Sequence, residues 1–383
     1  MPRLASLLLA AALAALLVAA PAHAQRAGQG GVRMNEIQVI GTHNSYKREI
    51  PEAEQAAYEA AIQTPGDYDR FLAYSHARLA EQLGAQGVRG LELDLFADPE
   101  GGLYAEPLVR RGLGLGPLPD PAWREPGIKT LHVADVDYAT TCVRFTSCLR
   151  EVEAWSQANP DHVPLLVLLE LKRSDRRVVA AGGVTAPAWD AANLDALDAE
   201  IRSVVGEEDM ITPDDLRRPG LTLEQSVRRF GWPTLRQSRG QLVFLLDNEP
   251  GAVRDAYTAG RRSLEGRVLF TNARPGQPDG AFVKRNDPLG ANQQEIQDLV
   301  TAGYLVRTRS DLPLTTVLSG DTALLTAALG SGAHVVSTDF PVAGMAARYG
   351  SDFVARLPEG GVARCNPVNA RANCRSDRLE RRR

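Results

Sequence analysis

Short apolar runs recur along the chain, and stretches with helical spacing of apolar residues separate most of them. Several runs are almost continuously apolar, which is typical of parallel strands buried on both faces. We predict eight strands, over residues 37–41, 90–95, 129–133, 165–170, 242–247, 268–272, 305–309 and 334–339. Helices are predicted between them, for example over residues 147–159, 193–205 and 292–302. This alternation predicts an α/β fold, a single TIM-type (β/α)8 barrel. A doubly wound open sheet is the alternative, but no Gly-x-Gly-x-x-Gly follows a predicted strand.

The first 24 residues have the pattern of a secretory signal peptide. Arg3 gives a positive start, residues 4–20 are predominantly apolar, and Ala22-His23-Ala24 forms a cleavage box. A retained membrane anchor is the alternative, but the run is somewhat short for a span. We expect cleavage after Ala24 and a secreted or periplasmic protein. Residues 25–374 then form the barrel, and the Arg-rich residues 375–383 a disordered basic tail.

Charge and cysteine content narrow the class of protein further. Lys and Arg number 43 against 47 Asp and Glu, a formal net charge of −4, which argues against a nucleic-acid partner. The 4 cysteines fall into two local pairs. In an oxidising compartment we expect the disulfides Cys142–Cys148 and Cys365–Cys374. A metal site is the alternative, and no Cys-x-x-Cys supports it.

Polar and charged side chains gather where the predicted strands end. Such ends meet at one mouth of a barrel, where a ligand can reach them. The residues expected there are His43 and Asn44 after the first strand, Glu92 and Asp94 on the second, His132 on the third, Glu170 and Lys172 after the fourth, Arg307 and Arg309 on the seventh, and Asp339 on the eighth. Glu92 and Asp94 are two residues apart and therefore share one face of their strand.

The acidic residues of this set call for a cation. Three carboxylates at one mouth repel one another and raise each other's pKa unless a positive charge lies among them. Together with an amide they offer only oxygen ligands, which suit Ca²⁺ or Mg²⁺. The ligand set is Asn44, Glu92, Asp94 and Glu170. A structural ion-pair network with Arg89 or Lys172 is the alternative.

Two histidines beside such a metal suit general acid/base chemistry near neutral pH. Lys172, Arg307 and Arg309 would meet an anion, most simply a phosphate. Metal, acid/base pair and cations together indicate phosphodiester cleavage. A single His at a strand end is more often a buried structural residue, but that alternative would have to hold at several strand ends independently. No catalytic role is assigned to the other histidines of the mature chain, His76, His162 and His334.

Residues 97–126 follow the second predicted strand and are rich in Gly, Pro and Leu. We expect this segment over the active face, because it leaves the carboxyl end of a barrel strand. Its leucines and Trp123 suggest an exposed apolar lip.

Seven stretches carry a resemblance to a known family: GTHNSY, GVRGLELDL, LHVADVDYATTC, PLLVLLELK, VRTRSD, SGAHVVSTDF and RCNPV. In this order, over nearly all of the mature chain, they resemble the secreted Ca²⁺-dependent phosphoinositide phospholipase C family, a branch of the phosphatidylinositol-specific phospholipase C superfamily. The resemblance implies a TIM barrel. It also implies cleavage of the phosphodiester between an inositol head group and diacylglycerol, with Ca²⁺ as cofactor.

The resemblance also implies roles for single residues. His43 and His132 match the two catalytic histidines, and Lys172 a phosphate-binding lysine; the residues that match the calcium ligands are Asn44, Glu92, Asp94 and Glu170. Arg307 and Arg309 match by position more than by motif. The implied base is Glu170 or His43, the second histidine protonates the leaving oxygen, and Asp339 is expected to orient His43. Which histidine acts as acid is left open, and oxygen ligands also allow Mg²⁺.

Two other functions remain as alternatives. A glycerophosphodiester phosphodiesterase or a sphingomyelinase D-like enzyme also combines a barrel, a His pair and Glu-x-Asp metal ligands. In the former, His-Arg-Gly normally follows the first strand, where this chain has His43-Asn44-Ser45. A barrel that binds phospholipid without cleaving it is the other alternative, and the complete set of histidines and acids argues against it.

Overall fold

The computed structural model describes residues 31–380, so the predicted signal peptide lies outside the described residues. Eight parallel strands form a nearly closed barrel, in the order β6-β5-β4-β2-β1-β9-β8-β7. A single parallel bridge between Asn272 and Phe282 joins β6 to β7 and completes the circuit. The barrel strands are β1 (Ile37–Thr42), β2 (Gly90–Phe96), β4 (Leu165–Leu171), β5 (Leu242–Leu246), β6 (Phe270–Thr271), β7 (Phe282–Lys284), β8 (Leu305–Arg309) and β9 (Val335–Thr338). The predicted fold class is confirmed.

One predicted strand is wrong, and one strand was missed. Residues 129–133 form no barrel strand; β3 (Lys129–Thr130) pairs antiparallel with the end of β2. The eighth barrel strand is instead β7. β7 has only three residues with a Lys at its end, so it lacks the apolar run by which its longer neighbours are recognised. The other seven predicted strands coincide with barrel strands.

The helices lie on the connections between strands. The predicted helices correspond to α5 (Phe145–Ala158), α7 (Ala191–Arg202) and α12 (Ala291–Thr301), each within three residues of its predicted ends. In α5 the buried residues include Phe145, Leu149 and Val152, which share one face at helical spacing. The other helices are α1 (Glu52–Ile62), α2 (Asp67–Phe71), α3 (Leu79–Leu83), α4 (Leu108–Gly112), α6 (Arg176–Ala180), α8 (Pro213–Leu216), α9 (Leu223–Phe230), α10 (Leu235–Ser238), α11 (Ala252–Tyr257), α13 (Thr315–Ser319) and α14 (Ala323–Gly330).

Two glycines bring β1 and β2 unusually close at the centre of the barrel. Gly41 and Gly90 are register partners. A Cβ on Gly41 would lie 2.7 Å from Val335 Cγ1 and 3.1 Å from Gly90 Cα, distances that a real side chain does not tolerate. Because the strands approach here, the residues that follow Gly41 and Gly90 are brought to the same mouth of the barrel.

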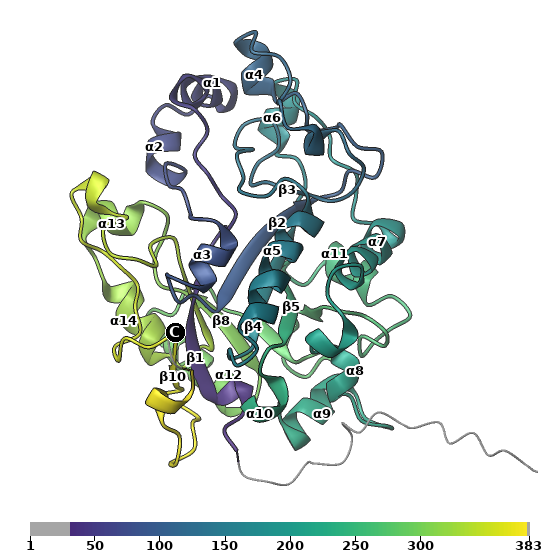
Figure 1. Ribbon diagram of the computed structural model, residues 1–383, viewed down its shortest axis with the longest axis vertical. Helices are drawn as coiled ribbons and strands as arrows, with labels where there is room; N and C mark the ends of the chain where they lie inside the picture. Colours follow the sequence, from purple (N-terminus) through teal and green to yellow (C-terminus); the bar gives the residue numbers. More distant parts are fainter. Residues whose placement is uncertain (1–30, 381–383) are drawn as a thin grey trace, which may run out of the picture. The chain divides into compact units, whose positions relative to one another are not determined.

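A second hydrophobic core caps that mouth. Segments that follow β1, β2 and β3 contribute most of it, and they include α1, α2 and α4. Figure 1 shows α1, α2, α4 and α6 at one end of the ribbon and α9 and α10 at the other. Trp123 belongs to this core: it is 4% exposed and packs edge-on against Tyr138. Trp123 therefore does not form the predicted apolar lip, whereas Leu113 and Leu115 in the same segment are exposed.

The carboxyl-terminal segment is tied to the barrel. Both predicted disulfides, Cys142–Cys148 and Cys365–Cys374, are present. The strand β10 (Ala363–Cys365) pairs antiparallel with β1. The predicted disorder of the tail is wrong for residues 375–380, because Leu379 is buried and Glu380 pairs with the buried guanidinium of Arg89. Residues 381–383 lie outside the described part of the chain.

The Arg89–Glu380 pair generates a prediction about stability. Glu380 Oε2 also accepts a hydrogen bond from the backbone N–H of Val163 at 2.7 Å. Glu380→Ala leaves a buried cation without its partner, which should lower the free energy of unfolding by about 3–5 kcal/mol. Chemical denaturation measures the change. Asp377→Asn is the control, because Asp377 and its partner Arg375 are largely exposed and should leave stability unaltered. An unchanged denaturation midpoint for Glu380→Ala would contradict the structural role of the tail.

Candidate active site

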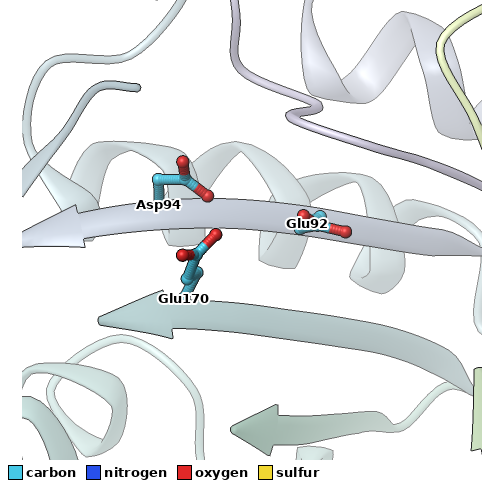
Figure 2. Close-up of side chains that lie close together, drawn as sticks. All are labelled: Glu92, Asp94 and Glu170. Carbon is cyan, nitrogen blue, oxygen red and sulfur yellow. The ribbon is translucent and has the colours of Figure 1, made fainter. Parts of the chain in front are cut away.

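Three carboxylates converge at the ends of β2 and β4. Glu92 and Asp94 project from β2, and Glu170 lies opposite Asp94 in the parallel register with β4. Each offers an oxygen, and these atoms all lie within 4.8 Å of one another. Figure 2 shows Glu170 directed towards Asp94 from the neighbouring strand. The sequence prediction that these three residues meet is therefore confirmed.

Two of the three carboxylates, Glu92 and Asp94, are buried where water screens their charges poorly, whereas the Glu170 side chain is 34% exposed. Asp94 is fully buried, and burial raises its pKa well above the ordinary value; Lys172 opposes the shift, while Glu170 and Glu92 add to it. The ammonium of Lys172 lies 3.2 Å from an oxygen of Asp94 and 3.2 Å from one of Glu170. Burial works against the charge on Lys172, yet the two carboxylates outweigh it and raise its pKa. One lysine faces two carboxylates, so the group still carries an excess of negative charge.

The oxygens at this site fit a hard divalent cation. Asn44 Oδ1 is buried and makes no hydrogen bond with the described part of the protein, and of the two buried oxygens of Asp94 one lies 3.2 Å from the Lys172 ammonium. Unpaired buried oxygens are costly, and a cation that binds oxygen would satisfy them. Asn44 adjoins the acidic group because the backbone N–H of Ser45 donates to the carbonyl of Glu92 at 2.9 Å. Asn44, Glu92, Asp94 and Glu170 are thus the residues that could hold the metal.

The two arginines of β8 have different environments. Arg307 is buried, and its guanidinium contacts Glu92, Asn286 and Ser337. These contacts place the guanidinium of Arg307 beside Glu92 inside the barrel. Arg309 Nη2 lies 3.4 Å from Asp339 and 3.4 Å from His43, and its Nε makes no hydrogen bond with the described residues. Arg309 is therefore the arginine that retains donor capacity at the mouth.

His43 follows β1 and lies between carboxylates. Its Nδ1 is 2.8 Å from Asp339 Oδ1, the contact that the sequence analysis expected. Its Nε2 lies 3.6 Å from Glu92 Oε1, next to the acidic group. Burial and then the nearby Arg309 lower the pKa of His43 well below its ordinary value. Asp339 therefore contacts one ring nitrogen of His43, and the other lies next to Glu92.

His132 reaches the mouth from a loop. The backbone N–H of Leu131 donates to the carbonyl of Asp94, which holds the end of β3 against β2. A tight turn then pairs Val133 with Asp137, and Asp135 within it adopts the left-handed conformation, with φ 73°. The turn places Asp137 Oδ2 2.7 Å from His132 Nδ1. Each histidine therefore has its own carboxylate partner.

Three supporting residues were not found by sequence reasoning. The buried ammonium of Lys47 lies 3.2 Å from Asp137 Oδ1, and together with His132 it lowers the pKa of Asp137 although burial favours the opposite shift. The hydroxyl of Tyr74 accepts a hydrogen bond from Asn44 Nδ2. Asp137 follows the predicted catalytic residue His132 by five positions in a turn, which is a usable sequence signal. Lys47 and Tyr74 have no such signal, because only tertiary packing brings them to the site.

The chain is similar in sequence to one family of proteins and in fold to several solved structures. The sequence model described as "Phosphoinositide phospholipase C, Ca2+-dependent" matches residues 32–367. No protein with curated function matches in sequence. A solved calcium-dependent phosphoinositol-specific phospholipase C from Pseudomonas sp. aligns with a TM-score of 0.52 at 14% identity, covering 87% of this chain and 95% of that one. A Ca²⁺-dependent phosphatidylinositol-specific phospholipase C from Streptomyces antibioticus gives 0.50 at 18% identity, covering 81% and 95%.

The structural neighbours are too distant in sequence to show more than a shared fold. The family model, in contrast, spans most of the chain and includes every residue of the candidate site. The chain belongs to the Ca²⁺-dependent phosphoinositide phospholipase C family.

Proposed function

We propose that this protein is a Ca²⁺-dependent phosphodiesterase that cleaves phosphatidylinositol-type lipids to diacylglycerol and a cyclic inositol phosphate. The observation that carries the proposal is the pair of His–carboxylate contacts, His43–Asp339 and His132–Asp137, at one mouth with a cation-binding acidic group. The fold-level neighbours support the substrate class: one Pseudomonas structure, at 14% identity, is described as a myoinositol complex.

Asn44, Glu92, Asp94 and Glu170 would hold the metal, which when bound acidifies the attacking inositol hydroxyl and neutralises charge on the phosphate. His43 is proposed to take the proton of the 2-hydroxyl, because burial and then Arg309 beside its Nδ1 lower its pKa and favour the neutral imidazole. Glu170 is the other candidate acceptor, but Lys172 already occupies its carboxylate. Lys172 and Arg309 are proposed to contact the phosphate, and Arg307 to hold Glu92.

The proton balance assigns His132 to the leaving group. The 2-hydroxyl oxygen bonds to phosphorus, the bond from phosphorus to the diacylglycerol oxygen breaks, and that oxygen needs a proton. His132 is proposed to supply it: burial lowers its pKa, and the carboxylate of Asp137 on its Nδ1 side opposes that shift and would stabilise the imidazolium. The result is one neutral diacylglycerol and one cyclic inositol phosphate.

The phospholipid partner is proposed to meet a rim of exposed apolar side chains. We define the apolar rim as Phe71, Leu113, Leu115, Leu312 and Leu318. Its members lie on or beside α2, α4 and α13, in connections that follow the carboxyl ends of β1, β2 and β8 (Figure 1). Among the described residues, no helix is both long and apolar enough to cross a bilayer. The exposure of these apolar side chains on one end of the barrel supports contact with a membrane surface.

Removing either histidine should nearly abolish cleavage. His43→Ala and His132→Ala should each reduce kcat about 10²–10⁴-fold, because each removes one proton-transfer group. Release of soluble inositol phosphate from phosphatidylinositol measures this. His162→Gln is the control, since His162 is buried at the other end of β4 against Ser156. Wild-type rates in either alanine variant would refute the assignment. Release of choline or glycerol phosphate instead would favour the alternative enzymes, and no release of any product the non-catalytic barrel.

Chelation of the metal ion should abolish the activity of the wild-type enzyme. EDTA should remove inositol phosphate release down to background, and added Ca²⁺ should restore it, because the buried oxygens of Asp94 and Asn44 then regain their cation. Restoration by Mg²⁺ is measured in parallel and decides between the two ions. Full activity in EDTA would contradict the metal assignment.

Polar substitutions in the apolar rim should weaken binding to a membrane surface without changing catalysis on a soluble substrate. Leu113→Ser combined with Leu115→Ser should weaken binding to phosphatidylinositol vesicles at least tenfold, since burying one leucine contributes about 1.5–3 kcal/mol. Vesicle sedimentation measures binding, and cleavage of a monomeric soluble substrate should not change. Phe230→Ser is the control, because Phe230 has similar exposure on α9 at the opposite end. Equal vesicle binding by both variants would remove the rim from the proposal.

A further inference from the structure

The hydroxyl of Tyr74 lies between a candidate metal ligand and a candidate acid/base group. Tyr74 comes from the segment between α2 and α3, and it is 3% exposed. Asn44 Nδ2 donates a hydrogen bond to its oxygen at 3.1 Å. His43 Nδ1 lies 3.4 Å from the same oxygen. No barrel strand carries Tyr74, yet its single polar atom touches both residues that follow β1.

The contact with Asn44 matters because an amide has two unlike ends. Nδ2 can only donate hydrogen bonds, and Oδ1 can only accept them or bind a cation. While the Tyr74 oxygen engages Nδ2, the other end of the amide is Oδ1, which is buried and accepts no hydrogen bond from the described residues. A rotation that exchanged the two ends would present an N–H group to a cation and abolish that ligand.

We propose that Tyr74 is a positioning residue that fixes the amide of Asn44 with its oxygen available to the cation and restrains the adjacent His43. The proposal rests on the cation site of the proposed function. Metal ligands are commonly oriented by hydrogen bonds from residues around them, and losing one such partner typically lowers metal affinity 10–100-fold. Tyr74 supplies that partner for the one neutral ligand of this site.

The ring of Tyr74 is held independently of its hydroxyl. The ammonium of Lys47 lies over the ring, 4.9 Å from its centroid, and also donates to the carbonyl of Leu72 at 2.8 Å. The ring of His76 packs edge-on against it, with centroids 5.6 Å apart, while His76 Nε2 lies 2.9 Å from the carbonyl of His43. Removal of the hydroxyl alone therefore leaves the ring in place, so a Tyr→Phe change tests one contact.

The experiment is the Ca²⁺ affinity of Tyr74→Phe, measured by isothermal titration calorimetry on the metal-free protein with CaCl₂. The dissociation constant should rise 10–100-fold relative to the wild type. Tyr104→Phe is the matched control, because Tyr104 is equally buried and its hydroxyl donates to the carbonyl of Ala97 in the capping core. It should lose some stability and keep its Ca²⁺ affinity. Wild-type affinity in Tyr74→Phe would overturn the proposal.

A double-mutant cycle isolates the amide. In Asn44→Asp the two ends of the side chain are both oxygens, so the effect of Tyr74→Phe on Ca²⁺ affinity should shrink to a few-fold or less. An equal loss in both backgrounds would show that Tyr74 does not act through the amide and would reject the proposal. The calorimetric readout is separate from catalysis: a wild type that binds Ca²⁺ but cleaves no inositol lipid refutes the proposed function alone. A wild type that binds no Ca²⁺ refutes the positioning role as well.

Discussion

The three carboxylates of the acidic group repel one another, and the other charged residues at the mouth of the barrel are placed so that they offset this repulsion. Asp94 and Glu170 face each other across paired strands, and Glu92 lies two residues before Asp94. Such a group is stable only if positive charge is brought to it. The protein supplies part of that charge with Lys172 on one side and Arg307 on the other. The buried oxygens of Asn44 and Asp94 that make no hydrogen bond with the described residues mark the place where a cation would bind. The other contacts of the site surround that place.

The parts of the site that lie on barrel strands were predictable from sequence. Glu92 and Asp94 share a strand face by their spacing of two, and a buried apolar run leads directly to Glu170. For residues at a strand end, the sequence therefore predicts both which side chains reach the mouth and in which direction they point. The prediction erred where that logic was applied to residues 129–133: the apolar pattern was real, but the segment pairs antiparallel on β2 and delivers His132 from a loop.

The rest of the site could not be predicted because its positions depend on packing between distant segments. Lys47 would be taken for a surface residue, yet it is fully buried against Asp137, 90 residues away in the sequence. Arg307 and Arg309 leave the same face of β8 two residues apart, and sequence spacing cannot tell that one meets Glu92 and the other Asp339. The prediction of a disordered Arg-rich tail was wrong for the same reason, because composition does not reveal that Glu380 forms an ion pair with Arg89.

The residues of the site therefore come from two parts of the structure, the barrel strands and the capping segments, and each part can change its position independently of the other. The acidic group belongs to β2 and β4, whose side chains are fixed by the register of the central sheet. His132, Asp137 and Tyr74 belong to the capping segments, whose hydrophobic core is distinct from that of the barrel. Loosening the cap would displace His132 and Asp137 while leaving the carboxylates of β2 and β4 together. The hydroxyl of Tyr74 is a direct link between the two parts, because it joins a capping segment to Asn44 at the end of β1.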